Sequence, residues 1–406
     1  MNRDLLKKYR EIRHETVRIC EPLEIEDYSV QPINFVSPPK WHLGHTTWFF
    51  EELVLKPSQD KFTYFNSNFG RLFNSYYKSL GDHWLQQERG HLSRPTVKEI
   101  LVYRRYVDDH MQKLIQTGRF DSAMSSVIMI GLQHEQQHQE LLYMDIKYIL
   151  GINTSPLSYA KNITSKSDNF NQSWNYFEEG IIEIGSEINI FSYDNENPRH
   201  KIYVYPFGIS NTLVSNGEFL EFVNSDAYSN PKYWLSLGWD WVRRENIRHP
   251  LYWKHIGEKW FEYTLYGLQE LDLNAPLVHV SYFEADAFAS YKKARLPSES
   301  ELEVYLRSIP KQAQAVLSAH LHPMCVKSPR AQVWCWTRSA YAPYPGFKPF
   351  QSVLYEYNGK FMCNQFVLKG GSIVTPEGHY RDSYRNFFLP EQRWMFSGIR
   401  LAKDLS

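Results

Sequence analysis

Two histidines spaced for metal binding stand in the stretch GLQHEQQHQELL, residues 131–142. His134 and His138 are four residues apart, so on an α-helix their side chains lie about 40° apart on one face. With Glu135 they form His-Glu-x-x-His, the pattern by which zinc proteases hold their metal and use the glutamate as general base. The same spacing suits any metal that binds imidazole, so the third ligand must indicate which metal the chain binds.

A third histidine stands upstream of this pair. His45 takes the place of a core residue in its own predicted helix, between Trp41 and Phe49 at four residues on either side. His134 and His138 likewise stand where the periodicity of their helix calls for apolar residues. We therefore predict that His45, His134 and His138 form one metal site.

Alternatives to this site remain in the sequence. His42 competes with His45 by spacing alone, and we interpret it as a polar residue near the helix start. Without a third ligand, the other two histidines would be a hydrogen-bonded pair in the core. Zinc proteases of this pattern take their third ligand from downstream, whereas His45 lies upstream, so we expect Glu135 to be a helix-surface charge. Three neutral imidazoles on an octahedral metal leave room for two substrates and dioxygen at Fe(2+).

The elements that position these histidines form the first half of the chain. Four segments with helical periodicity predict a helical bundle over residues 1–152. One segment opens on Thr96 with Glu99 three residues later, as a capping box, and another opens on Asp121. Periodicity is then lost among Ser, Asn, Thr and Lys, which predicts a linker over residues 153–173. The helical segments are residues 5–19, 39–55, 96–116 and 121–150.

Residues 174–406 follow a different pattern. Short β-rich runs such as HKIYVYPFGI and QFVLKGGSIV alternate with brief helical stretches and are broken by Gly, Pro and Asn. This half is expected to fold as a loop-rich α+β domain, which makes the fold class of the whole chain α+β. The sequence has no glycine-rich loop of the phosphate-binding type.

Composition limits the partners of the protein. Lys plus Arg and Asp plus Glu both number 45, so no excess positive charge attracts nucleic acid or anionic lipid. The four cysteines are too few for a disulfide framework, which indicates reduced thiols. No run approaches about 18 apolar residues, and the N-terminus lacks the apolar core of a signal peptide. We predict a soluble, cytoplasmic protein that binds small molecules, with no nucleic-acid or membrane partner, and assign no oligomeric state.

Motifs along nearly the whole chain resemble one enzyme family. WHLGHTTWFFEELVL, FNSYYKSLG and HEQQHQELL resemble the DinB-like bundle of ergothioneine-pathway sulfoxide synthases. PLVHVSYFEADAFASY, ARLPSESELE, LKGGS and RNFFLPEQRWMFSGIRLA resemble the formylglycine-generating-enzyme or sulfatase-modifying domain of those synthases. The resemblance implies an N-terminal DinB-like four-helix bundle followed by a C-type-lectin-like formylglycine-generating-enzyme domain.

The resemblance also implies roles for particular residues. His45, His134 and His138 match the iron ligands of the family, so the implied cofactor is Fe(2+). Gln137 matches a glutamine that contacts the imidazole of the substrate, and an amide three residues from His134 lies near the same helix face. Asn386 matches a residue that helps to hold the betaine end of the substrate.

Further matches concern the acid and the thiol. Tyr76 and Tyr77 resemble the pair from which one branch of the family draws its active-site acid, and a phenol with a pKa of about 10 can give a proton to reduced oxygen. Arg89 is a candidate clamp for a substrate carboxylate. Phe387 and Phe388 occupy the positions where synthases that use γ-glutamylcysteine have tryptophan and aspartate. Phe387 is therefore expected to line the substrate site. Because a phenyl ring at position 388 cannot form a salt bridge with the glutamyl ammonium group, cysteine is expected to be the thiol.

The sequence also departs from the family. Formylglycine generation depends on a cysteine pair near the C-terminus, and GGSIVTPEGHYRDSYRNFF contains no cysteine, so that activity is excluded. Cys335 in VWCWT replaces the usual glutamate, and Lys369 in LKGGS replaces the usual arginine. Both departures concern the C-terminal half and leave the predicted iron site intact.

The implied activity is oxidative C–S bond formation. The family joins a thiol to C2 of the imidazole of hercynine (Nα-trimethylhistidine) and oxidises the sulfur to a sulfoxide with O2, in ergothioneine biosynthesis. Related synthases act on histidine, as in ovothiol formation, or use selenium, as in selenoneine formation, and both alternatives stay open. A zinc hydrolase or thiol transferase on a DinB-like bundle, and a binding module without catalysis, are the more distant alternatives.

Overall fold

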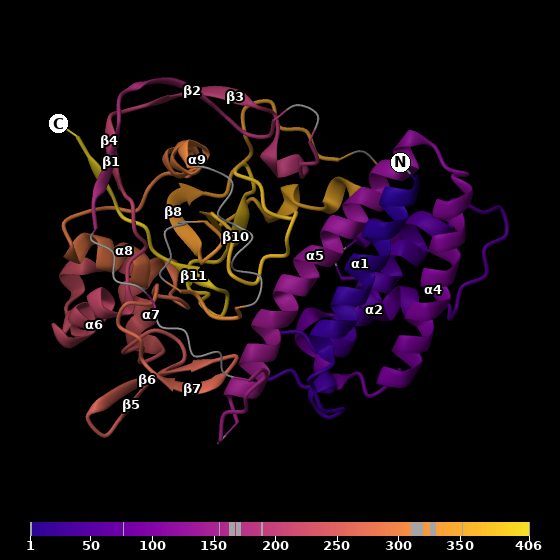
Figure 1. Ribbon diagram of the computed structural model, residues 1–406, viewed down its shortest axis with the longest axis horizontal. Coiled ribbons are helices and arrows are strands. Elements are labelled where there is room, and N and C mark those ends of the chain that lie inside the picture. Colours follow the sequence, from indigo (N-terminus) through magenta and orange to yellow (C-terminus); the bar gives the residue numbers. More distant parts are fainter. Residues whose placement is uncertain are drawn as a thin grey trace. The chain divides into compact units, whose positions relative to one another are not determined.

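The chain folds into two compact units, Met1–Ala160 and Lys161–Ser406. The division falls inside the predicted linker. The N-terminal unit is helical and the C-terminal unit mixes helices with strands (Figure 1), which confirms the α+β class. The computed structural model describes residues 2–75, 77–153, 155–161, 167, 172–187, 190–309, 320–324, 330–350 and 352–405.

Long helices dominate the N-terminal unit. Helix α2 (Pro39–Phe50) contacts α4 (Val97–Thr117) and α5 (Ser122–Gly151). Helix α1 (Asn2–Cys20) contacts the same two helices, so the four lie alongside one another (Figure 1). All 12 residues of α2 are buried, which makes α2 the centre of the unit. The helices are α1 (Asn2–Cys20), α2 (Pro39–Phe50), α3 (Phe69–Phe73), α4 (Val97–Thr117) and α5 (Ser122–Gly151), and η2 (Glu51–Leu55) extends α2 by a π-helical turn.

The helix starts agree with the capping signals in the sequence. The Thr96 hydroxyl accepts a hydrogen bond from the Glu99 backbone N–H at 3.2 Å, and the Glu99 carboxylate accepts one from the Thr96 N–H at 2.7 Å, as a capping box requires. Asp121 caps α5 by accepting from the Met124 N–H at 2.8 Å. Pro39 occupies the first turn of α2, where its missing N–H costs nothing. The predicted starts of these three helices are confirmed.

The C-terminal unit is built from short strands and helices. Among the described residues, the strands pair in the orders β1-β4-β12, β2-β3, β5-β6-β7 and β10-β9-β8-β11. Only the β8–β11 pair is parallel among these ladders. The strands are β1 (Trp174–Phe177), β2 (Gly180–Ile184), β3 (His200–Val204), β4 (Phe207–Ser210), β5 (Trp253–Ile256), β6 (Lys259–Thr264), β7 (Gly267–Glu270), β8 (Trp334–Ala340), β9 (Phe366–Lys369), β10 (Asn386–Phe388), β11 (Ser397–Gly398) and β12 (Ala402–Asp404), and the helices are α6 (Asn216–Asn224), α7 (Ser236–Arg244), α8 (Tyr282–Tyr291) and α9 (Glu299–Ser308).

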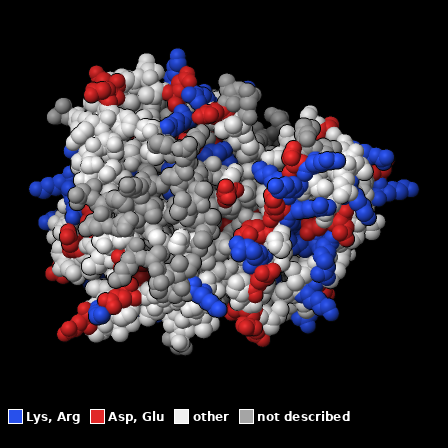
Figure 2. Space-filling model, viewed as in Figure 1, with Lys and Arg blue, Asp and Glu red and all other residues white. Residues whose placement is uncertain are grey.

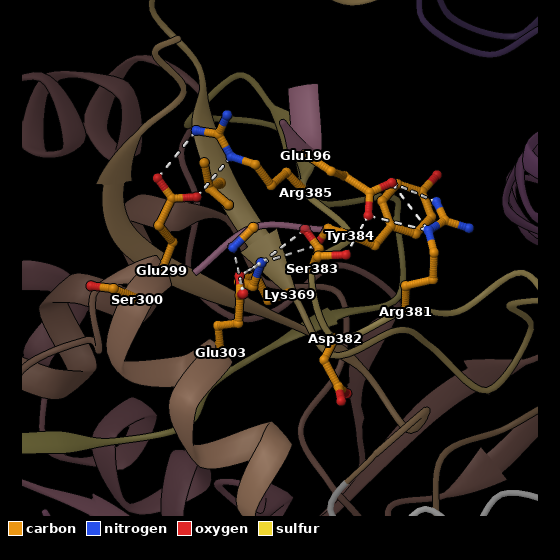
Figure 3. A network of polar contacts seen from close by, with 12 residues as sticks. Glu196, Glu299, Ser300, Glu303, Lys369, Arg381, Asp382, Ser383, Tyr384 and Arg385 are labelled. Atoms are coloured by element: carbon orange, nitrogen blue, oxygen red, sulfur yellow. Dashed lines mark hydrogen bonds and ion pairs between the residues drawn. The ribbon is translucent and has the colours of Figure 1, made fainter. Parts of the chain in front are cut away.

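Buried ion pairs hold the segment that leads into β10 (Figure 3). Lys369, at the end of β9, pairs with Glu303 of α9 at 2.9 Å, and both side chains are fully buried. Arg385 directly precedes β10 and donates from Nε to a Glu299 carboxylate oxygen at 2.8 Å. Removing one partner of a buried pair leaves an uncompensated charge, so these pairs fix α9 against the sheet. Further contacts in the figure join Arg381 and Ser383 to Glu196, and Lys369 to the carbonyl oxygens of Ser383 and Tyr384.

Charged side chains of both signs share the surface. On the face shown in Figure 2, basic and acidic side chains are interspersed over the helical unit. The sequence has equal numbers of acidic and basic residues, and side chains of both signs lie next to one another on this face. Within the described part of the chain, no helix combines the length and apolar character needed to cross a membrane.

Candidate metal centre

The structure brings the three predicted ligands together. The ligand atoms of His45, His134 and His138 all lie within 4.8 Å of one another, and the three side chains are buried. His45 belongs to α2, whereas the other two stand one turn apart on α5. We call these residues the three-histidine cluster. Within the described residues, it is the one group of three or more His, Cys, Asp or Glu side chains close enough to share an ion.

The orientation of His45 is fixed by its surroundings. Its Nδ1 lies 2.6 Å from the Phe73 carbonyl oxygen, and because a carbonyl only accepts, Nδ1 carries the proton. The Nε2 lone pair of the neutral ring therefore faces the cluster. Trp41 stacks on the imidazole at 4.5 Å and 12°, and Trp48 lies on it at 5.7 Å and 17°. These indoles and the carbonyl hold the ring in one position, as is usual for metal-binding histidines.

Gly44 allows the Phe73 segment to approach α2. A Cβ atom at Gly44 would lie 2.3 Å from Cε1 of the Phe73 ring, a distance that no real contact adopts. The glycine inside WHLGH thus makes space for the residue whose carbonyl oxygen binds His45. This carbonyl could not be predicted from the sequence, because a backbone acceptor leaves no pattern of residue types.

The spacing and protonation of the cluster fit a metal ion. The Nε2 atoms of His45 and His134 are 3.1 Å apart. Two nitrogens that bind one ion at about 2.1 Å and at a right angle are about 3.0 Å apart. Burial lowers the pKa of His134 to about 3, and it lowers the pKa of His45 and of His138 well below the usual value. Since metals bind neutral imidazole, the cluster is in its binding form at neutral pH.

His42 lies near the start of α2, as interpreted from the sequence, but it is buried and hydrogen-bonded. Its side chain is 1% exposed. Its Nδ1 lies 2.8 Å from Nδ1 of His138, and its Nε2 lies 3.0 Å from a carboxylate oxygen of Asp145. Sequence reasoning missed Asp145 altogether. Its position seven residues after His138, two turns along the same helix face, was the available signal.

The expected surface position of Glu135 is also wrong. Its carboxylate is fully buried, accepts from Arg13 Nη1 at 2.9 Å and from Thr16 Oγ1 at 2.6 Å, and pairs with Arg104. Burial by itself would raise the pKa of this carboxyl, but the charges of Arg104 and Arg13 outweigh that effect and lower it to about 2. A carboxylate held by two guanidinium groups is a poor general base, so the glutamate is unsuited to the role it has in zinc proteases.

The predicted acid pair is described only in part. Tyr77 is buried, and its ring lies 5.8 Å from that of Trp48, which in turn lies on His45. Asn74 accepts from the Tyr77 N–H and donates to the Tyr77 carbonyl, so this backbone is anchored on both sides. Tyr76 lies outside the described residues. The structure therefore places Tyr77 one aromatic ring away from a predicted ligand.

Two further predicted contacts also belong to the helical unit. Arg89 is buried, lies 3.3 Å above the Trp41 ring and donates to Ser37 Oγ at 2.8 Å. Its role as a carboxylate clamp stays a prediction. Gln137 is half-buried on α5, next to His138.

The remaining predicted residues belong to the C-terminal unit. Asn386 and Phe387 open β10, which pairs antiparallel with β9, and both side chains are partly exposed. The Phe387 ring stacks on Tyr341 at 4.1 Å and 9°, and the Asn386 side chain accepts from the N–H of Phe387 at 3.0 Å. Each is thus held in place within its own unit, and their contribution to a substrate site stays a prediction.

Known families match both units. The DinB superfamily matches residues 8–142, and the Sulfatase-modifying factor enzyme 1-like domain matches residues 164–317. The hercynine oxygenase of Mycobacterium tuberculosis is 29% identical over 69% of this chain and 72% of its own length. That of Mycolicibacterium smegmatis is 30% identical over 53% of this chain and 56% of its own length. Ergothioneine biosynthesis protein 1 of Schizosaccharomyces pombe is 28% identical over 54% of this chain and 28% of its own length.

Two features define the class of this protein. A DinB-type helical unit contains a buried three-histidine cluster, and a sulfatase-modifying-type domain follows it along the chain. The names of the relatives refer to hercynine or to ergothioneine biosynthesis. The chain belongs to the ergothioneine-pathway sulfoxide synthase family, as its motifs predict.

Proposed function

We propose that this protein is a cytoplasmic Fe(2+)- and O2-dependent enzyme that joins the sulfur of cysteine to C2 of the imidazole of hercynine. The three-histidine cluster, with its 3.1 Å separation of Nε2 atoms, is the observation that carries the proposal. The names of the relatives, hercynine oxygenase above all, support hercynine as the substrate. In the balanced reaction, hercynine loses its C2 hydrogen and cysteine its thiol hydrogen. One oxygen atom of O2 enters the sulfoxide and the other leaves as water.

The cluster would hold the iron with three neutral imidazoles. Iron, when bound, supplies a redox centre that ionises a thiol and activates dioxygen. The protein contributes fixed ligand orientation, through the Phe73 carbonyl and the indoles of Trp41 and Trp48 around His45. Trp41 and Trp48 are each 2% exposed, and such apolar walls would keep bulk water away from the reactants.

Other residues would bind the substrates and deliver a proton. Gln137, three residues after His134 and so near the same helix face, would offer an amide to a ring nitrogen of hercynine. Asn386 would help to hold the betaine end, and Phe387 would line the substrate site. Tyr77, one ring away from His45, would donate its phenolic proton to reduced oxygen and so favour C–S bond formation over oxidation of the thiol alone.

The C-terminal unit supports cysteine as the thiol. Phe388 packs edge-on against Trp394 at 5.3 Å, so its position presents an apolar surface. A phenyl ring offers the glutamyl ammonium of γ-glutamylcysteine a weak cation–π contact in place of a salt bridge. Arg89 is proposed as the clamp for the carboxylate of the smaller thiol.

Oxygen uptake tests this function. Protein loaded with Fe(2+) under anaerobic conditions should consume O2 only when hercynine and cysteine are both present. Dependence on histidine in place of hercynine, or on a selenium donor in place of the thiol, would assign the protein to the related branches. Hydrolysis that depends on Zn(2+), without oxygen uptake, would contradict the proposal. The pairing of Glu135 with two arginines argues against such hydrolysis, because it makes the glutamate a poor general base.

A further inference from the structure

A buried hydrogen-bond chain leads away from the three-histidine cluster. Nδ1 of His138 lies 2.8 Å from Nδ1 of His42, and Nε2 of His42 lies 3.0 Å from Oδ2 of Asp145. The same carboxylate oxygen accepts from the Ser37 N–H at 2.9 Å. His42 and Asp145 are 1% and 2% exposed, so bulk water does not replace these contacts.

The direction of donation along this chain follows from the groups at its end. The Asp145 carboxylate only accepts, so His42 donates from Nε2. In the neutral tautomer that donates from Nε2, His42 has a bare Nδ1, which can only accept, so His138 then donates from its own Nδ1. The proton of His138 is thereby placed on Nδ1, and its Nε2 keeps a free lone pair. The opposite arrangement would place a proton on Nε2 of His138 and block it as a ligand.

The same contacts explain why His42 stays outside the ligand set. Both of its nitrogens are engaged, one by His138 and the other by Asp145. A metal at His42 would have to displace one of these partners. His45, three residues later on α2, instead has its Nε2 directed at His134. The two histidines of WHLGH therefore have separate tasks, one inside the cluster and one behind it.

We propose that His42 and Asp145 are positioning residues that fix the tautomer and ring orientation of His138 for metal binding. This inference rests on the proposed function, because it assumes that the cluster binds a metal. Metal-binding histidines commonly donate their second N–H to a carboxylate or carbonyl, and losing such a partner weakens metal affinity about 10- to 100-fold. Here the imidazole of His42 lies between His138 and the carboxylate of Asp145, so the carboxylate acts on His138 through His42.

Variants at His42 separate hydrogen bonding from packing. His42→Phe keeps a ring of similar size but removes the acceptor, whereas His42→Gln loses the ring and can place an amide oxygen near Nδ1 of His138. We expect Fe(2+) affinity, measured by anaerobic equilibrium titration, to fall about 10- to 100-fold in His42→Phe and to recover largely in His42→Gln. The matched control is His110→Gln, at a histidine bonded to the Tyr106 carbonyl, which should bind as tightly as the wild type.

Variants at Asp145 test the far end of the chain. Asp145→Asn keeps the shape but weakens the acceptor, and it should lower Fe(2+) affinity and alter the visible absorption of bound Co(2+). The control is Glu51→Gln, which removes the charge of another buried carboxylate, one bonded to Tyr103. Circular dichroism identifies variants that fail to fold.

The outcomes are distinguishable. Wild-type Fe(2+) affinity in both His42→Phe and Asp145→Asn would overturn the positioning roles. It would not contradict the assignment of the three-histidine cluster as the metal site. If His42→Phe keeps the wild-type Fe(2+) affinity and His42→Gln loses it, the role of His42 is packing alone, and the inference is overturned as well. Failure of the wild-type protein to bind Fe(2+) or Co(2+) would overturn both the inference and the proposed function.

Discussion

The Nε2 atoms of His45 and His134 face each other at 3.1 Å between α2 and α5. Two buried imidazoles that bring lone pairs this close need a shared proton or a shared cation. His45 cannot supply the proton from Nε2 in its neutral form, because Nδ1 is committed as donor to the Phe73 carbonyl. Either His134 shares a proton from its own Nε2, or it carries the proton on Nδ1 and both Nε2 lone pairs can bind one cation, with His138 completing the set.

The first prediction concerns these ligands. His45→Ala, His134→Ala or His138→Ala should each reduce Fe(2+) affinity beyond the roughly 100-fold effect typical of supporting residues, because one of three protein ligands is lost. His42→Ala should weaken binding without abolishing it. Anaerobic titration measures the affinities. Full binding by His45→Ala, with complete loss in His42→Ala, would show that the wrong histidine of WHLGH was assigned.

The second prediction concerns the acid. Replacing Tyr77 or Tyr76 by Phe removes one hydroxyl and keeps the ring, so iron and substrates should still bind. In the variant that lacks the acid, the product should shift from sulfoxide toward a sulfinic acid of the free thiol. Mass analysis of the products measures the ratio. A wild-type sulfoxide yield from both single variants would place the acid at another residue.

The third prediction concerns Gly44. Gly44→Ala places a methyl group against the Phe73 ring, so we expect a loss of about 1–3 kcal/mol in the free energy of unfolding, as for overpacked cores, together with weaker metal binding. Urea denaturation measures the first effect. Gly70→Ala, within α3 where a Cβ meets nothing within 4 Å, is the control and should be neutral or slightly stabilising. Equal stability of the two variants would contradict the packing argument.

The fourth prediction concerns thiol reactivity. Burial raises the pKa of the Cys20 thiol to about 12, and burial also raises the pKa of Cys335, whereas Cys363 is exposed. The thiolate is the reactive form, so at pH 8 an alkylating reagent should label Cys363 and spare the other two. Peptide mass mapping of the folded protein reads this out. Comparable labelling of Cys20 before unfolding would contradict its buried position.

The fifth prediction concerns thiol choice. In competition at equal concentration with hercynine, cysteine should have a higher kcat/KM than γ-glutamylcysteine. Phe388→Asp should raise the relative kcat/KM of γ-glutamylcysteine, since a carboxylate can pair with its ammonium group. Phe388→Leu is the matched apolar control. A preference of the wild-type protein for γ-glutamylcysteine would overturn the argument from Phe388 and leave the metal site untouched.

Local signals in the sequence predicted much of this structure. The capping residues Thr96 and Asp121 mark true helix starts because a cap depends on neighbours within one turn. The three-histidine cluster was predictable because two ligands share one helix face. Glu135 was misplaced because α5 is buried on most of its sides, so periodicity alone does not separate surface from core. Its partner Arg13 is 122 residues away along the chain, and no spacing rule connects them.

The fate of the C2 hydrogen of hercynine distinguishes C–S bond formation from oxidation of the thiol alone. Fe(2+)-loaded protein is incubated under air with cysteine and hercynine that carries deuterium at C2, and the product is analysed by mass spectrometry. The expected product is one hercynine joined to one cysteine with one added oxygen atom and complete loss of the C2 deuterium. A coupled product that retains the C2 deuterium, or oxidised cysteine with hercynine unchanged, would contradict the proposed reaction.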